Sequence, residues 1–337
     1  MKKLTPLITA LILAILTIAA FVIYRLHASI TDKEPLPFSN LNQETSYIDP
    51  LKTKADKSST ISASPWEGSI SLYSSDNGLD FGFNGTLLFK NAAVPHILKT
   101  IDGDLIATFQ YFYDKDTDEV IENGIMHYSI SSDNGETWSD AEKLILEDLP
   151  EVCGCPTPDN PSMQSAVDPT LAQLEDASFR IYFTYHAVGD DYSMTSTAIA
   201  DEIDEAFVYE GKIFENEDTY LLDPAVVYYD GLWHYYNSSN GYNDGTPEEY
   251  VNIHATSEDG QTFELEENIN FSIGFLGGAV AMEDGIRFYG AGGVDGTLSA
   301  FSTDGYEWEE DNVPRYPGSD PGVVQLDDGS FLMLGQS

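Results

Sequence analysis

Alternation of apolar and polar residues, interrupted by tight turns, is the dominant pattern of this chain. The segment His127–Trp138, HYSISSDNGETW, alternates as a half-buried strand does and then ends in the polar run Ser131–Trp138. Asp133 can hydrogen-bond to the backbone nearby, Gly135 supplies a positive φ angle, and Trp138 can fold back over the turn. The pattern therefore predicts a β-hairpin with a self-stabilised turn.

The same turn recurs along the chain. Its clearest copy reads S-x-D-x-G-x-T-W, and a second copy of that length spans Ser74–Phe81, with Phe81 in the place of Trp. Shorter variants span Ser257–Phe263 and Ser302–Trp308, and a degenerate copy spans Ala200–Phe207. The motif resembles the Asp-box, or bacterial neuraminidase, repeat of the sialidase-like β-propellers. Turn chemistry accounts for each of its residues, so we interpret the copies as structural elements rather than as a functional site.

A second repeated unit alternates with these turns. It consists of an Asp-Pro, Val-Pro or Gly-Gly pair, an apolar strand, a Gly-containing turn and an aromatic strand. Its copies begin at Val94, Asp168, Asp223, Gly277 and Asp320. Five such units alternate with five box-like turns, and short strands repeated every ~40–70 residues are typical of a propeller. We therefore predict an all-β fold, a five-bladed β-propeller.

The two ends of the repeat region are predicted to form one blade together. In each blade, strands A to D are expected from the axis outward, with strand A after the Asp-Pro pair and the box turn between C and D. The chain ends just after strand B of the last blade, whereas Ser69–Phe89 holds an unpaired C–D hairpin. Pairing these segments closes the ring and removes two exposed sheet edges.

The amino-terminal residues differ from the rest of the chain. An uncharged apolar run, Leu4–Tyr24, follows Lys2 and Lys3 and precedes Arg25, and its length is sufficient to span a bilayer as a helix. We interpret it as an uncleaved signal anchor with a cytoplasmic amino terminus, because the lysines lie on that side. A long signal peptide cleaved near Ala28 is the alternative.

Three regions follow from these patterns. Residues 1–25 form the anchor, residues 26–67 a polar, flexible stalk or linker, and residues 68–337 the propeller. The propeller is therefore expected outside the cytoplasm, on a single-pass protein of the cell membrane or, after cleavage, in secreted form.

The charge and the cysteines narrow the possible partners. A formal net charge of −42 argues against nucleic acid or an anionic membrane surface as a ligand and suits a saline or calcium-containing exterior. The two cysteines, Cys153 and Cys155, leave a strained disulfide, free thiols and half of a metal site as open alternatives.

Candidate chemistry is expected on the face that carries the long connections between strands, because function usually lies in loops held by a rigid scaffold. These connections are Tyr113–Asn123, Asp148–Val167, Ala187–Met194 and Ser238–Glu249. The first residues of each strand A lie on the same face near the axis. They are expected to present His96, Asp168, Asp223, Gly278 and Asp320 to the mouth of the central channel.

Three aspartates at one mouth suit glycoside hydrolysis, which needs a carboxylic acid and a carboxylate whose pKa values are pushed apart. The arrangement resembles the five-bladed glycosidases of the arabinanase, xylosidase and fructosidase kind. That resemblance implies that Asp168, Asp223 and Asp320 are catalytic. The general-acid Glu of that family has no single matching position in this sequence. Glu248 and Glu249 are candidates for it. Two other interpretations remain open, namely that each Asp caps the turn before Pro, and that the aspartates hold a central cation with His96.

Sialidase activity is not expected, despite the box-like turns. Sialidases hold the substrate carboxylate with three arginines. Away from the anchor, the chain offers only Arg180, Arg287 and Arg315, and the first two lie in predicted B strands. An arginine triad is therefore not predicted.

Further residues complete the predicted site. The candidate substrate-binding residues are His96, His186, Tyr242 and Glu248. An acidic loop with Asp114, Asp116 and Asp118 at alternate positions is a candidate calcium site, although it lacks the Gly and Glu of an EF-hand. No cofactor is expected to be required, and Ca²⁺ is the one candidate ion.

The sequence thus predicts a membrane-anchored, extracytoplasmic propeller that acts on carbohydrate in the manner of a glycoside hydrolase. The alternative is a cell-surface propeller without catalysis that binds a glycan or a protein.

Overall fold

The chain divides into two compact units, residues 1–41 and 42–337. A computed structural model describes part of the second unit, namely residues 68–114, 119–152, 166–190, 193–214, 221–243, 246–266, 269, 277–291, 297–311 and 319–336. The predicted anchor and stalk, residues 1–67, lie outside the described residues. Within the described stretches, no helix is long and apolar enough to cross a membrane.

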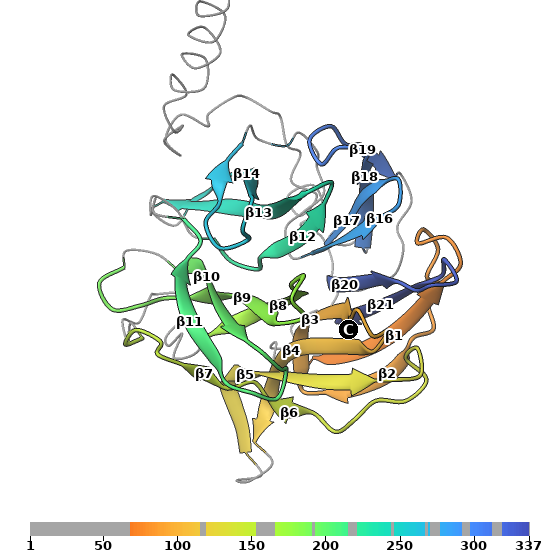
Figure 1. Ribbon diagram of the computed structural model, residues 1–337, viewed down its shortest axis with the longest axis horizontal. Coiled ribbons are helices and arrows are strands. Elements are labelled where there is room, and N and C mark those ends of the chain that lie inside the picture. The colour runs from red at the N-terminus through yellow and green to blue at the C-terminus, as the bar shows by residue number, and fades with distance from the viewer. Residues whose placement is uncertain are drawn as a thin grey trace, which may run out of the picture. The chain divides into compact units, whose positions relative to one another are not determined.

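The described residues form five β-sheets around a central axis, so the predicted five-bladed all-β propeller is confirmed (Figure 1). Blade 1 consists of β3 (Ala92–Lys99), β4 (Leu105–Asp114), β5 (Glu119–Ser131) and β6 (Glu142–Lys143). Blade 2 consists of β8 (Val167–Gln173), β9 (Phe179–Tyr185), β10 (Met194–Ala200) and β11 (Phe207–Lys212), with β7 (Leu146–Glu147) at its outer edge. Blade 3 consists of β12 (Ala225–Tyr229), β13 (Leu232–Asn243), β14 (Thr246–Ser257) and β15 (Glu264–Leu265). Blade 4 consists of β16 (Gly278–Met282), β17 (Gly285–Ala291), β18 (Thr297–Ser302) and β19 (Glu309–Asp311). Blade 5 consists of β20 (Ser319–Gln325), β21 (Phe331–Gln336), β1 (Ser69–Ser75) and β2 (Thr86–Lys90).

Blade 5 joins the two ends of the repeat region, as the sequence predicts. Strand β1 pairs antiparallel with β21, from Ile70 opposite Gln336 to Ser75 opposite Phe331. The lone hairpin therefore supplies the outer half of the last blade and leaves no unpaired edge between β1 and β21. Blade 2 differs from the prediction, because the short strand β7 pairs parallel with β11 and adds a fifth strand.

Two of the predicted long loops are mainly strand. Around Tyr113–Asn123, strands β4 and β5 continue their ladder to the pair Asp114–Glu119. Around Ser238–Glu249, strands β13 and β14 continue to the pair Asn243–Thr246. The polar residues in both segments predict loops. Hydrogen bonds between strands join backbone groups, however, so a ladder can form whether the side chains are polar or apolar.

The apolar core lies mainly between neighbouring blades. The cluster between blades 1 and 2, for example, joins Ile106 and Met126 to Ile181, Phe183 and Phe207. All five of these side chains are buried. Alternation along the strands supplies apolar side chains to both neighbouring interfaces, and their burial favours the ring.

The predicted box turns are held by their own polar side chains. In the clearest copy, Asp133 accepts hydrogen bonds from the backbone N–H of Thr137 at 2.8 Å and from its hydroxyl at 2.5 Å. The hydroxyl of Ser131 donates to Asp133 at 2.8 Å and accepts from the N–H of Gly135 at 2.9 Å. The indole of Trp138 donates to the carbonyl of Gly135 at 3.2 Å. Turn chemistry thus accounts for the motif, as expected.

The first copy has a different register from the one that we predict. Asn77, and not Asp76, accepts hydrogen bonds from two backbone N–H groups, and its partner is Ser75 rather than Ser74. This pattern matches the shorter turns, in which Asp259 and Asp304 accept the same pair of bonds. The side-chain oxygen of Asn can accept the same hydrogen bonds as a carboxylate. Alignment of the copies on their Asp residues therefore assigns the wrong register to the first turn.

The box turns also connect neighbouring blades. The hydroxyl groups of three buried tyrosines on the second strand of a blade donate to the box glycine of the next blade. These pairs are Tyr182–Gly260 at 2.6 Å, Tyr236–Gly305 at 3.1 Å and Tyr289–Gly78 at 2.9 Å. The box glycine has no side chain, so the tyrosine can approach its carbonyl closely.

Two arginines reinforce the same junctions. Arg180 binds Glu210 through two hydrogen bonds of 2.8 and 2.9 Å and donates to the carbonyl of Asp259 at 2.6 Å. Arg287 donates to the carbonyl of Asn77 at 3.5 Å. Both arginines therefore serve the contacts between blades and not a carboxylate-binding triad at the axis.

The loss of one such tyrosine hydroxyl is expected to weaken the ring. Tyr182→Phe leaves the buried carbonyl of Gly260 without its donor and should lower the free energy of unfolding by about 1–3 kcal/mol. Urea denaturation checks this value, and Tyr228→Phe, at a 44% exposed tyrosine, is the control that should change it by less than about 0.5 kcal/mol. Equal effects of the two changes would contradict the proposed contribution of the junction.

Buried histidines should make the fold sensitive to acid. His234 and His254 are hydrogen-bonded to each other at 3.0 Å, and burial lowers the pKa of both, that of His254 to about 3. Because the unfolded state takes up a proton near pH 6.5 and the folded state does not, stability present above that pH decreases as the pH falls toward 3. His254, with its pKa of about 3, should cost about 2 kcal/mol of stability by pH 5, and His234 should add to this loss.

The comparison of wild type with His254→Gln isolates this contribution. Urea midpoints at pH 7.5 and pH 5 should differ less for the variant than for the wild type. An unchanged difference would show that the histidine pair does not titrate on unfolding.

Candidate active site at the propeller axis

In the four blades where it is described, the residue that enters the innermost strand has an unusual backbone conformation. Val94, Asp168, Asp223 and Asp320 have φ angles of 49, 58, 54 and 50°, and each precedes a proline. Beside three of them the register of the first two strands shifts, which marks a bulge between them. The bulge directs these side chains toward the axis, where all four line one small cavity.

Strand register corrects the predicted ring of five residues. Thr170, His96 and Gly278 lie opposite Tyr182, Thr108 and Tyr289, respectively, at equivalent positions of their blades. His96 and Gly278 therefore belong to a second layer, two residues further along the strand. The residue of blade 1 that corresponds to the aspartates is Val94, and that of blade 4, residue 276, lies outside the described residues.

Val94 shows whether the aspartates are needed for the turn itself or for another purpose. Asp tolerates the left-handed conformation, so an Asp-Pro pair is consistent with a turn that merely needs Asp there. Val94 adopts the same conformation although it is β-branched and cannot cap a turn. The left-handed conformation consequently does not require a carboxylate, and the three aspartates that adopt it need another explanation.

The cavity that these residues enclose is small. Its volume is about 20 Å³, which is close to the space of one water molecule. It is lined by Val94, Pro95, His96, Asp168, Pro169, Thr170, Asp223, Pro224, Gly277, Gly278, Asp320 and Pro321. The predicted catalytic residues Asp168, Asp223 and Asp320 are thus brought together, at the start of the innermost strands of blades 2, 3 and 5.

Asp168 and Asp223 form a buried pair of carboxyl groups. Burial raises the pKa of Asp168, while hydrogen bonds from the Thr184 hydroxyl and from the backbone N–H of Asp223 lower it. Burial raises the pKa of Asp223 well above its usual value, and the charges of Asp168 and Asp320 add to this effect. Their side chains are hydrogen-bonded to each other, and the pKa is raised further at Asp223, where repulsion by Asp168 and Asp320 adds to burial, than at Asp168, where hydrogen bonds oppose burial.

Asp320 is the third carboxyl group and has fewer partners. Its side chain is 8% exposed, and burial raises its pKa to about 7. The hydroxyl of Ser319 donates to Oδ2 at 2.9 Å, whereas Oδ1 has no hydrogen-bond partner in the part of the chain that the structure describes. A buried carboxyl oxygen without a partner is costly, and a ligand or water in the cavity would satisfy it.

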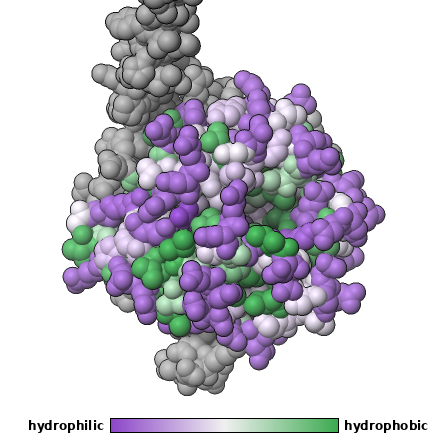
Figure 2. Space-filling view, in the orientation of Figure 1, coloured by the Kyte–Doolittle hydropathy of each residue, from purple (hydrophilic) through white to green (hydrophobic). Residues whose placement is uncertain are grey.

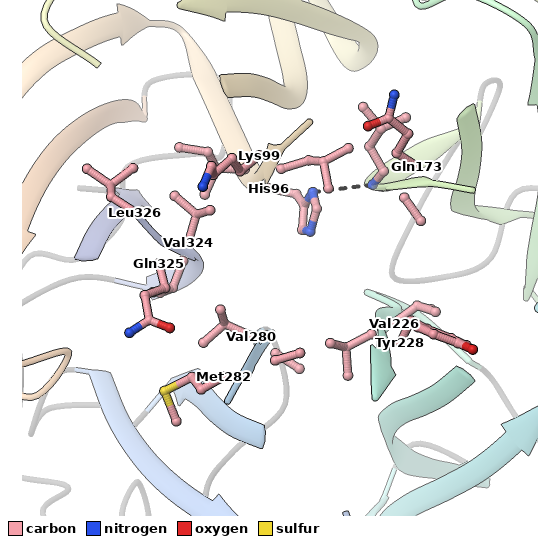
Figure 3. A pocket seen from close by; sticks show the side chains of 18 of the residues that line it. His96, Lys99, Gln173, Val226, Tyr228, Val280, Met282, Val324, Gln325 and Leu326 are labelled. Carbon is pink, nitrogen blue, oxygen red and sulfur yellow. Dashed lines mark hydrogen bonds between the residues drawn. The ribbon is translucent and has the colours of Figure 1, made fainter. Parts of the chain in front are cut away.

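His96 lies between this cavity and a wider channel. Its Nδ1 accepts a hydrogen bond from the backbone N–H of Leu171 at 3.3 Å, and burial lowers its pKa to about 4, so the ring is neutral at pH 7. The channel has a volume of about 990 Å³, and Figure 3 shows His96, Val226, Val280 and Val324 around it. Its lining near the axis is largely aliphatic, which offers little chemistry.

Of the remaining predicted substrate-binding residues, only the His186 side chain is described, and it does not line this cavity. The His186 ring is buried and makes a 3.0 Å hydrogen bond with the carbonyl of Asp190, which fits a structural role. The backbones of Tyr242 and Glu248 lie in β13 and β14, while their side chains lie outside what the structure describes.

The structure gives no support for the two predicted metal sites. Asp114 ends β4, and Asp116 and Asp118 lie outside the described residues, so the acidic loop stays a prediction. Among the described residues, no group of three His, Cys, Asp or Glu side chains is arranged to hold a metal ion. The central cation site of the aspartates with His96 is therefore not supported.

Sequence reasoning missed Thr184. It lies in β9, is fully buried, and contacts Asp168 through its hydroxyl. A threonine inside an alternating strand gives no local signal of such a contact. Only the strand register, which places it beside the bulge at Asp168, identifies it.

The fold is shared with solved structures of glycoside hydrolases. A GH43_1 enzyme from Xanthomonas citri in complex with xylose has a TM-score of 0.55 and 13% identity, over 73% of this chain and 86% of that chain. CoXyl43, a β-xylosidase/α-arabinofuranosidase from a compost microbial metagenome in a calcium-free complex with xylotriose, has a TM-score of 0.52 and 13% identity, over 72% and 84%. The β-xylosidase RS223 has a TM-score of 0.51 and 15% identity, over 73% and 91%.

At these identities the similarity establishes the fold alone. Neither a protein-family model nor a curated protein sequence matches the chain. The resemblance of the turns to Asp-box repeats rests accordingly on the residues and hydrogen bonds described above.

Val94 supplies a test of the backbone interpretation. Val94→Asn keeps a side chain of similar size but tolerates the left-handed conformation better, and should raise the free energy of unfolding by about 1 kcal/mol. Thermal and urea denaturation measure the change. A loss of stability would show that packing of the valine outweighs its backbone strain.

Proposed function

We propose that this protein is a carbohydrate-active propeller that cleaves glycosidic bonds, with Asp168, Asp223 and Asp320 as its reacting and supporting carboxyl groups. The observation that carries the proposal is the convergence of three buried carboxyl groups on one axial cavity, in a backbone conformation that does not require them. Burial raises all three pKa values, that of Asp320 to about 7, so that a carboxyl group able to hold a proton near neutral pH is present, as acid–base catalysis needs.

The surroundings of each carboxyl group suggest its role. Asp320, with a pKa of about 7, holds a proton in many molecules at neutral pH and is the candidate general acid. Asp168, which accepts hydrogen bonds from Thr184 and Asp223, is the candidate base. Asp223 keeps its own proton and fixes the position of Asp168.

A balanced reaction follows from these roles. Asp168 removes a proton from a water molecule, whose oxygen forms the new bond to the anomeric carbon. The bond from that carbon to the leaving oxygen breaks, and Asp320 donates its proton to that oxygen. Room for one water in the cavity suits such a direct displacement, which inverts the configuration of the sugar.

The size of the cavity favours a substrate that binds at its mouth. A volume of about 20 Å³ admits water but no sugar ring, so the scissile bond would lie above the carboxyl groups, on the face of the long connections. Tyr242 and Glu248 are candidates for contacts to the sugar there, and Glu248 is an alternative candidate for the general acid. The solved structures that hold xylose and xylotriose make xylosides and arabinosides the first substrates to test.

We also propose where the protein acts. The apolar run Leu4–Tyr24 would anchor it in the cell membrane, with the propeller outside the cytoplasm on a stalk of residues 26–67. The net charge of −42 suits a saline exterior, and Ca²⁺ remains the one candidate ion.

A propeller that binds a glycan or a protein without catalysis is the second candidate. The small volume of the axial cavity favours it, because the described carboxyl groups are barely accessible to a ligand larger than water. The absence of a matched general-acid Glu in the sequence favours it as well.

Hydrolysis by the soluble domain, residues 60–337, tests the proposal. Aryl xylosides, arabinosides, fructosides, galactosides and sialosides would be supplied with salt and calcium. Asp168→Asn and Asp320→Asn should each lower kcat by about 100-fold or more, because each removes a proton-transfer group. The exposed Asp140→Asn is the matched control and should leave kcat unchanged.

The activity of the variants separates the two candidates. Loss of turnover only in the axial variants, with intact folding, supports hydrolysis at the axis. Activity that survives both changes would place the reaction elsewhere, and a folded domain that turns over no substrate would favour the binding protein.

A further inference from the structure

The hydroxyl of Thr184 connects the two paired aspartates. Its oxygen accepts a hydrogen bond from the backbone N–H of Asp223 at 3.1 Å, and its proton is donated to the carboxylate of Asp168. A threonine hydroxyl has one proton to donate, so both contacts fix its orientation. Thr184 is 0% exposed and lies opposite Val167, directly beside the bulge that carries Asp168.

The contact to the next blade occurs in a second place with a different side chain. Gln336 occupies the equivalent position of blade 5, opposite Ser319, and its side-chain oxygen accepts from the N–H of Val94 at 3.4 Å. This position therefore supports the first bulge residue of the following blade. Only in blade 2 does a described residue at this position also hold a carboxylate of its own blade.

We propose that Thr184 is a positioning residue, which locks Asp168 and Asp223 against each other and favours the arrangement in which Asp168 is ionised and Asp223 holds the proton. The catalytic role of these groups rests on the proposed function, whereas the question of which of Asp168 and Asp223 carries the proton does not. A donor aimed at Asp168 favours its ionised form, and a carboxylate there can accept a proton from Asp223.

The backbone N–H of Asp223 is a second donor to Asp168, and the neighbouring side chains do not replace the hydroxyl of Thr184. Asp320, on β20, is acidic and raises the pKa of Asp223 by its charge. His96, on β3, is neutral and directs Nδ1 to the N–H of Leu171. The hydroxyl of Tyr235, on β13, bonds to Thr195 and Asn237. Thr184 is thus the one described hydroxyl that contacts Asp168.

Thr184→Val and Thr184→Ser test the proposal in the soluble domain. Valine has the same shape without the hydroxyl, and serine restores the hydroxyl. The matched control is Thr108→Val, which removes another fully buried hydroxyl that bonds between blades, to the carbonyl of Pro169 at 3.3 Å, and touches no carboxylate. Carbon-13 NMR of labelled aspartate carboxyl groups, followed over pH, reports each pKa without any substrate.

Thr184→Val should raise the apparent pKa of the Asp168 carboxyl, whereas Thr184→Ser and Thr108→Val should leave it at the wild-type value. On an active substrate, Thr184→Val should lower kcat by roughly tenfold, with little change in KM, and move the acidic limb of the pH profile upward. Serine should restore both.

The outcomes distinguish this proposal from the proposed function. A carboxyl titration that shifts in Thr184→Val, in a domain that hydrolyses nothing, would support the role of Thr184 and contradict catalysis. Titration curves that are identical in wild type, Thr184→Val and Thr108→Val would overturn the role of Thr184, whether or not the protein is an enzyme.

Discussion

Close approach of the five innermost strands at the axis is the constraint on which the remaining structure depends. Where two neighbouring blades are described at the axis, the carbonyl of the proline that begins the innermost strand of one blade packs against the preceding blade. Gly278 faces the carbonyl of Pro321 and Gly322 that of Pro95, where an added Cβ would lie only 2.7 and 2.6 Å away. At the other junctions, hydroxyl groups contact the carbonyl instead, from Thr170 to Pro224 at 2.5 Å and from Thr108 to Pro169 at 3.3 Å.

This packing explains why the carboxyl groups are buried at all. The strands carry small residues or hydrogen-bond donors in the layer that must pack tightly, and the bulge directs the preceding layer toward the axis. Side chains in that layer share a space of about 20 Å³ and lose most of their water. Desolvation then raises the pKa values of Asp168, Asp223 and Asp320, and it is the largest cause for each of them.

The elements that the sequence predicts well are those whose boundaries are marked by characteristic turn residues. The Asp-Pro pairs, the glycine turns and the serine–aspartate turns each identify a strand boundary, and their alternation gives the blade number and the ring closure. Local chemistry also fails in identifiable ways. Asn77 replaces the expected Asp76 because either side chain can accept the turn hydrogen bonds, and polar residues in β4, β5, β13 and β14 conceal long ladders.

The candidate site is predicted only in part, because its layers are defined by register between strands. The three aspartates are recognisable from the Asp-Pro repeat, but His96 and Val94 are two residues apart, and only pairing with β4 shows which belongs with the aspartates. Thr184 is invisible for the same reason, since its contacts to Asp168 and Asp223 span 16 and 39 residues of sequence.

The two ends of the blades satisfy their polar groups differently. At the box turns, Tyr182 and Arg180 donate to backbone carbonyls and to Glu210, which compensates their burial, whereas the buried Nε of Arg287 lies 3.6 Å from Asp311 and makes no hydrogen bond among the described residues. At the axis, like charges face one another, and Oδ1 of Asp320 has no partner among the described residues. Buried carboxyl groups without full hydrogen bonding lower stability. Val94 shows that the backbone at this position can form without a carboxyl group, so the aspartates are present for a reason other than folding. The convergence of three buried carboxyl groups, which the turns do not have, is the physical argument for chemistry at the axis rather than at the turns.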